Sequence, residues 1–147
     1  MTKPKPIKAI IITADFHKDI SRFMVKTAQQ ELANNHAEVL GTIHVPGSYE
    51  IPLVAQTVLK KYKPDILVTL GYIEKGHTLH GEVMGHVIMN QLVSLQLKYQ
   101  TPIGLGIIGP GATLTQARQR QKPVATAAVK AALAVFKTQH NSGIIKK

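Results

Sequence analysis

Short apolar runs rich in β-branched residues alternate with longer stretches of helical spacing along most of the chain. The strand-like runs cover residues 7–13, 39–45, 66–70 and 103–108, and the helical stretches cover about 20–34, 51–62, 78–99 and 124–136. Nearly continuous apolar strands are typical of a parallel sheet that is covered on both faces. Because strand–helix alternation builds right-handed βαβ units, the pattern predicts a three-layer α/β/α sandwich with a four-stranded parallel sheet.

The chain has 147 residues, a length that suits one compact domain with its own core. We expect a single domain over residues 1–147, with a flexible start at 1–6 and a frayed tail at 141–147. Cysteine is absent, which excludes disulfides, thiolate metal sites and a cysteine nucleophile. No long apolar region follows the basic N-terminal segment, and no run approaches the ~20 apolar residues that span a bilayer. We therefore expect a cytoplasmic protein that does not enter a membrane.

Lysine and arginine together number 18 against 8 acidic residues, which gives a formal net charge of +10. A basic nucleic-acid-binding module is one explanation. Part of the excess lies near the two ends of the chain, however, and few aromatic residues accompany the basic residues between them. Phosphate-bearing small substrates and a solvated basic surface explain the charge more simply, so we expect small-molecule substrates and no nucleic acid.

Four polar segments follow the predicted strands. They read ADFHKDI (14–20), VPGSYEIP (45–52), GYIEKGHTLHGEV (71–83) and QARQR (116–120), and the glycine-rich segment 109–111 between the last two is expected to be a turn. In parallel sheets of this kind, ligands bind at the carboxyl ends of the strands. These segments are therefore where a functional site is expected.

The third segment has the features of an anion site. Gly76 allows a close backbone approach, and His77 and Thr78 lie where the long helix is expected to begin, so free N–H groups and the helix dipole favour a phosphate there. Lys75 and the distant Arg120 could add positive charge. His80 would lie in the first helical turn, and imidazole suits proton transfer near neutral pH.

Simpler explanations stay open for these residues. Thr78 could act only as a helix N-cap, and most of the histidines could be ordinary surface or core residues. His77, His80 and His86 could be imagined as metal ligands, but no acidic or cysteine partner stands at convincing spacing, so no metal is expected.

Glu50 and Phe16, which lie in the first two segments, could likewise have either a structural or a functional role. Glu50 lies in a largely apolar stretch and could contact a polar ligand or serve as a solvated acid at a helix start. Phe16 could fill the core or stack on a flat heterocycle at the end of a strand.

Taken in order, the segments resemble the lumazine synthase family over nearly the whole chain. That family carries an aromatic residue followed by Asn after its first strand, then a VPGA(F/Y)EIP element, a GxxIxGxTxH element followed by an acid, and a QAxxR element. The corresponding residues here are Phe16-His17, VPGSYEIP at 45–52, GHTLH at 76–80 followed by Glu82, and QARQR at 116–120. The second and third elements are specific, whereas the first and fourth are weak alone.

The resemblance implies a flavodoxin-like fold and an enzyme, 6,7-dimethyl-8-ribityllumazine synthase, which needs no cofactor and no metal. Its substrates are 5-amino-6-(D-ribitylamino)uracil and 3,4-dihydroxy-2-butanone 4-phosphate. Imine formation, loss of phosphate, ring closure and dehydration follow in this family.

The resemblance also implies roles for individual residues. His80 is implied to transfer protons. His77, Thr78 and a residue of a neighbouring subunit that matches Arg120 are implied to bind the phosphate. The remaining substrate-binding residues are Phe16, which stacks on the pyrimidine, Ser48, Tyr49 and Glu50 at the ribityl chain and ring edge, Tyr72, Ile73 and Glu74 at the pyrimidine pocket, and Leu105 at a position that is often aromatic.

Several residues depart from the family pattern. His17 replaces the usual Asn, Glu74-Lys75 replaces an apolar-basic pair, and His77 stands where a small or acidic residue is common. The segment Gly109–Ala112 replaces a threonine-rich turn and carries one extra residue. A divergent paralogue that binds a flavin or pteridine-like ring without this chemistry is therefore an alternative.

The resemblance further implies a homo-oligomer, a ring of five with shared active sites. Some members close such rings into icosahedral shells, a choice associated with a glycine-containing turn between the last two helices. Residues 120–125 contain no glycine, and Pro123 stiffens the expected connection. A free pentamer or a pair of pentamers is therefore the expected assembly.

Overall fold

The computed structural model describes residues 2–141 and 143. Within these residues, four strands and four α-helices alternate, with one short 3-10 helix before the second α-helix. The elements are β1 (Ile7–Ala14), α1 (Lys18–Asn34), β2 (Ala37–Val45), η1 (Ser48–Glu50), α2 (Ile51–Lys61), β3 (Ile66–Glu74), α3 (His80–Tyr99), β4 (Ile103–Ala112) and α4 (Leu114–His140). The predicted succession of strands and helices is confirmed.

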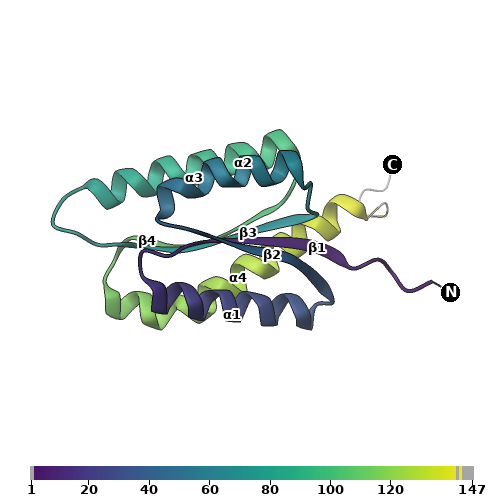
Figure 1. Cartoon of the computed structure of the whole chain (residues 1–147), viewed down its shortest axis with the longest axis horizontal. Coiled ribbons are helices and arrows are strands. Elements are labelled where there is room, and N and C mark those ends of the chain that lie inside the picture. The colour runs from purple at the N-terminus through teal and green to yellow at the C-terminus, as the bar shows by residue number, and fades with distance from the viewer. Residues whose placement is uncertain (1, 142, 144–147) are drawn as a thin grey trace.

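All four strands are parallel and form one sheet in the order β2-β1-β3-β4. Helices α2 and α3 lie over one face of this sheet, and α1 and α4 lie over the other (Figure 1). The predicted three-layer α/β/α sandwich is therefore confirmed, and the arrangement is consistent with a flavodoxin-like fold.

The alternation of side chains along each strand divides the core into two clusters. On β1, Ala9 and Ile11 pack toward α1 and α4, whereas Ile10 and Ile12 pack toward α2 and α3. The central strand β3 is buried along its whole length except at Glu74, its last residue. Burial on both faces explains why these strands read as continuous apolar runs.

The expectation of a turn at residues 109–111 is wrong, because β4 continues through them to Ala112. An irregularity in the ladder absorbs the extra length, so that Tyr72 pairs with Ile108 and Glu74 pairs with Ala112. Gly109 makes this path feasible: its φ is +95°, and a Cβ built there would lie 2.4 Å from the Ile73 carbonyl oxygen. Pairing with β3 thus overrides the local turn signal of glycine and proline.

The expected connection at residues 120–125 is also absent, because α4 is continuous from Leu114 to His140 with Pro123 inside it. A capping box starts this helix: the Thr113 hydroxyl accepts from Gln116 N, and the Gln116 side chain accepts from Thr113 N. Buried alanines such as Ala117 and Ala125, on both sides of Pro123, pack the helix on the core. Residues 120–125 are therefore helical, and no stiff turn is present there to disfavour a closed shell.

The ends of the chain are only partly described. Residues 2–6 precede β1 without regular structure, and α4 ends at His140, where the frayed tail was expected to begin. The prediction for residues 1, 142 and 144–147 lies outside the described residues. Over the described part of the chain, no helix has both the length and the apolar character needed to cross a membrane.

Candidate active site

The carboxyl ends of the strands meet at the end of the molecule opposite the start of β1 and the end of α4, where the β3–α3 loop projects beyond the sheet (Figure 1). A cavity of about 300 Å³ opens there. Seven of the residues expected to bind substrate or move protons line it: Phe16, Ser48, Tyr72, Ile73, Glu74, Thr78 and His80. The βα loops after β1, β2 and β3 thus converge on one site, as parallel topology requires.

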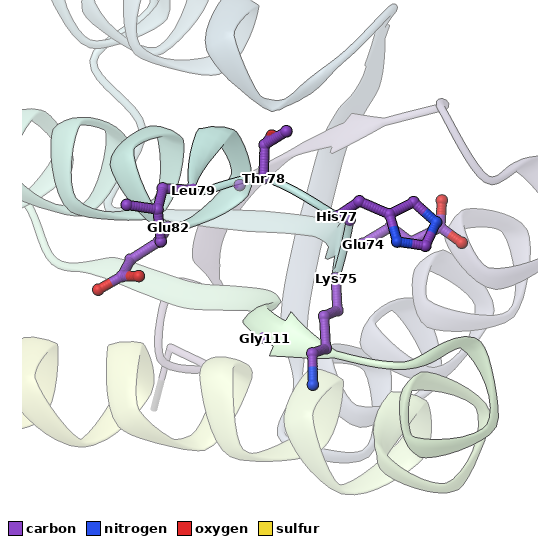
Figure 2. Close-up of a pocket in the computed structure, with 9 residues that line it drawn as sticks. Glu74, Lys75, His77, Thr78, Leu79, Glu82 and Gly111 are labelled. Carbon is purple, nitrogen blue, oxygen red and sulfur yellow. The ribbon is translucent and has the colours of Figure 1, made fainter.

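A second cavity of about 330 Å³ adjoins the first and shares Glu74, Gly76, Thr78 and Gly81 with it. The β3–α3 loop forms most of its wall, and Gly111 of β4 closes one side. Figure 2 shows Lys75 running past Gly111 toward the α4 layer, while Thr78 points to the opposite side of the loop. His77 lines only this second cavity.

His80 is the first residue of α3 and is exposed to solvent. Its backbone N–H donates to the Thr78 hydroxyl at 3.3 Å, so Thr78 does supply a hydrogen bond at the helix start while also lining both cavities. The Tyr49 ring lies at one side of the imidazole, with the ring centroids 6.0 Å apart. An imidazole therefore lies at the positive end of a 20-residue helix.

Phe16 does not fill the core, since 72% of it is exposed. Its ring stands edge-on to the His17 ring at 5.1 Å and contributes to the wall of the 300 Å³ cavity. An exposed aromatic face at a strand end suits stacking against a flat heterocycle.

The turn that carries Phe16 is held by the side chain of Asp15. That carboxylate lies 2.9 Å from His44 Nδ1 and accepts a hydrogen bond from the Ser21 hydroxyl at 2.8 Å. Partial burial alone would raise the pKa of Asp15, but the hydrogen bonds from His44 and Ser21 and the charges of His44 and Lys18 outweigh it and hold the pKa below its ordinary value.

Tyr72 closes the floor of the cavity toward β4. Its hydroxyl donates to the Ala112 carbonyl oxygen at 2.7 Å, and its ring is almost completely buried. Burial and the nearby Glu74 carboxylate both raise the pKa of Tyr72. The phenol therefore stays protonated as a donor that ties β3 to the end of β4.

Five of the expected substrate-binding residues do not line the 300 Å³ cavity of this chain, namely Tyr49, Glu50, His77, Leu105 and Arg120. Glu50 is exposed at the start of α2, the position of the solvated helix-start acid. Leu105 lines an apolar groove formed mainly by β4 and α4, and Arg120 lines a separate cavity of about 570 Å³ formed by the end of β4 and the start of α4. A single chain therefore does not bring Leu105 and Arg120 into one cavity with His80.

Sequence reasoning missed Met84, which also lines the cavity. Met84 follows His80 by four residues on α3, so helical periodicity places both on the same side of the helix. That spacing could have revealed it. Among the described residues, no group of three histidine or acidic side chains is arranged to hold a metal ion.

The chain is similar to known proteins along most of its length. The family model described as 6,7-dimethyl-8-ribityllumazine synthase matches residues 6–141. A protein of that name from Metallosphaera sedula is 39% identical over 127 residues, covering 86% of this chain and 84% of the relative. A protein of the same name from Saccharolobus islandicus is 39% identical, and the match covers 88% of this chain and 84% of the relative. One from Staphylothermus marinus is 38% identical, and the match covers 82% of this chain and 81% of the relative. The chain therefore belongs to the 6,7-dimethyl-8-ribityllumazine synthase family.

Proposed function

We propose that this protein condenses 5-amino-6-(D-ribitylamino)uracil with 3,4-dihydroxy-2-butanone 4-phosphate to form 6,7-dimethyl-8-ribityllumazine, releasing phosphate and water. The observation that carries the proposal is the shared cavity of Phe16, Thr78 and His80. The cavity combines an aromatic ring on which a flat heterocycle can stack, a helix N-terminus that favours a phosphate, and an imidazole that can transfer protons.

The pyrimidine stacks on Phe16 in this proposal, with its edge toward the end of β3 at Ile73 and Glu74. Ser48, which is buried in the cavity wall, and the exposed Tyr49 and Glu50 of η1 bind the ribityl chain. The phosphate binds at the β3–α3 loop, where His77 and Thr78 precede the first-turn N–H groups of α3.

Chemistry in this arrangement consists mainly of positioning and proton transfer. The 5-amino nitrogen attacks the ketone carbon, and loss of water gives an imine. Phosphate then leaves by elimination, and the ribityl-bearing nitrogen closes the ring with loss of a second water. His80 moves protons between nitrogen, carbon and oxygen in these steps, while the cavity holds both reactants in one orientation.

A neighbouring subunit completes the site in this proposal. Phe16, Thr78 and His80 are all exposed in the single chain, and Arg120 lies outside their cavity. A further groove, between α3 and α4, exposes apolar side chains, among them Val93, Leu97 and Val135. Burial of such a patch favours association with another copy, and the family resemblance implies a ring of five. A cytoplasmic location stays the expectation for a chain without cysteine.

The test is to mix the purified protein with both substrates and to follow the fluorescence of the lumazine product. Product formation above the uncatalysed rate supports the proposal. Tight binding of the uracil or of a flavin without turnover favours a divergent paralogue, and the absence of both binding and turnover rejects the proposal.

A further inference from the structure

His17 lies between the two aromatic residues that border the cavity. Its ring centroid is 5.1 Å from that of Phe16 and 4.8 Å from that of Tyr72. Its backbone is fixed as well, because the His17 carbonyl oxygen accepts from Ser21 N at 2.9 Å at the start of α1. The imidazole therefore has a defined place beside the cavity without being one of the residues that line it.

Nε2 of His17 is excluded from solvent and has no hydrogen-bond partner among the described residues. It lies 3.4 Å from Oε2 of Glu74. A buried polar atom without a partner is unfavourable, so this nitrogen favours any position of the carboxylate that completes a hydrogen bond. The Glu74 side chain is free to turn toward this nitrogen, since 47% of that side chain is exposed.

Neither neighbouring polar side chain, Tyr72 or Lys75, competes with His17 for the Glu74 carboxylate in the described part of the chain. The Tyr72 hydroxyl is committed to the Ala112 carbonyl oxygen, and the Lys75 side chain runs past Gly111 toward the α4 layer (Figure 2). The only ion pair of Glu74 among the described residues is the one with His17. At the same time, Glu74 contributes to the walls of both cavities.

We propose that His17 is a positioning residue that orients the Glu74 carboxylate, and that this carboxylate selects a flat ring presenting N–H donors at its edge. His17 acts through Glu74 and does not touch the ligand. The proposal rests on the proposed function for the identity of that ring, the uracil substrate. Both residues are positions where the chain departs from its family pattern, and the fold brings these two departures into contact.

The test compares His17→Phe, His17→Gln, Glu74→Gln and the double variant His17→Phe/Glu74→Gln. Phenylalanine keeps the ring against Tyr72 but removes the donor, so we expect the KM for the uracil to rise about 10- to 100-fold, the range for a hydrogen bond to a charged group. The KM for the sugar phosphate and kcat should stay within about 3-fold of the original protein. Glutamine restores an N–H donor and should recover part of the affinity.

Coupling between the two residues is the decisive measurement. If His17 acts through Glu74, the double variant should be no more than about 3-fold weaker for the uracil than Glu74→Gln alone. His86→Ala is the matched control, because it breaks another His–Glu pair, the one with Glu82 at 3.9 Å. His86 lines neither cavity and Glu82 lines only the 330 Å³ one, so the uracil KM should stay unchanged.

Calorimetric titration with the uracil alone separates this inference from the proposed function. If the original protein binds and converts the uracil but His17→Phe matches it, or if both substrates are affected equally, the positioning role is overturned and the function stands. If the protein binds the uracil without turnover, the dissociation constants of the variants for the uracil take the place of the KM values, and the same expected differences test the role of His17. If it neither binds nor converts the uracil, the proposed function fails and the inference fails with it.

Discussion

His80 is the residue on which the proposed chemistry depends most. It is exposed at the start of α3, so His80→Ala should fold normally and keep its thermal unfolding midpoint. We expect kcat for lumazine formation to fall by about 10- to 10,000-fold, the span of general acid–base contributions. Steady-state kinetics with both substrates check this. His140→Ala, at the far end of α4, is the control, and an unchanged kcat in His80→Ala would assign His80 a structural role only.

Asp15 should make stability depend on pH in the acidic range. Its pKa in the folded protein lies below the ordinary value of 3.8, so the ionised carboxylate favours the folded state. This contribution is fully present above pH 3.8 and is lost as the pH falls through the lower, folded pKa. Asp15→Asn should therefore lower the free energy of unfolding at neutral pH by about 1 kcal/mol, because the hydrogen-bonded carboxylate is only partly buried.

The measurement is urea unfolding of the original protein and Asp15→Asn at several pH values from 7 down to 3. The difference in the free energy of unfolding between the two proteins should shrink as the pH falls below 3.8. Asp19→Asn removes the carboxylate of an exposed pair with Arg118 and should change stability by less than about 0.5 kcal/mol. A gap that does not depend on pH would contradict the assigned role of the Asp15 charge.

The packing of α4 on β4 depends on a close approach at Gly104. A Cβ at this position would lie 2.3 Å from the Ala128 carbonyl oxygen, which belongs to the helix backbone and cannot rotate away. Gly104→Ala should therefore push α4 outward and destabilise the protein by about 1–3 kcal/mol, the usual cost of overpacking. Gly41→Ala in β2 is the matched control, since a Cβ there meets nothing within 4 Å. Equal unfolding midpoints for the two variants would refute the close contact.

Pro123 lies on an exposed part of α4 and leaves that helix without one backbone hydrogen bond. Pro123→Ala restores the N–H and should raise the free energy of unfolding by about 1–2 kcal/mol, because the gain in the helix exceeds the ~0.4–1 kcal/mol that proline contributes by restricting the unfolded chain. Denaturant unfolding at a fixed protein concentration measures this, with Lys122→Ala as the neighbouring control. A loss of stability would mean that the helix ends at Pro123 in solution.

A shared site can be tested with mixed assemblies. We expect His80→Ala and Arg120→Ala each to be poorly active alone, the second through a raised KM for the phosphorylated substrate, since its proposed contact is with phosphate. If Arg120 completes a neighbour's site, unfolding and refolding the two variants together at equal amounts should restore about one quarter of the sites.

Light scattering of the original protein accompanies the mixing experiment. A ring of five or a larger assembly agrees with the proposal, and a stable monomer refutes it. Mixed assemblies with no recovered activity would show that His80 and Arg120 act within one chain, against the shared site.

The sequence by itself determined the layers of this protein and the edge at which its site lies. β-branched apolar runs are stable as strands only when both faces are covered, so their alternation with helices implied the α/β/α order before any contact was known. The same topology placed the segments that carry Phe16, Ser48 and His80 at one edge. These features follow from periodicity and connectivity, which are local properties of the chain.

Only the tertiary structure decided where β4 ends, whether α4 is broken and which site residues meet. Glycine and proline at 109–111 and Pro123 are local signals for a turn and a break, but ladder pairing with β3 and the packing of Ala117 and Ala125 outweigh them. Likewise, the contact of His17 with Glu74 and the separation of Arg120 from His80 arise from distances between distant segments. Such distances depend on how whole elements pack, and no local pattern encodes them.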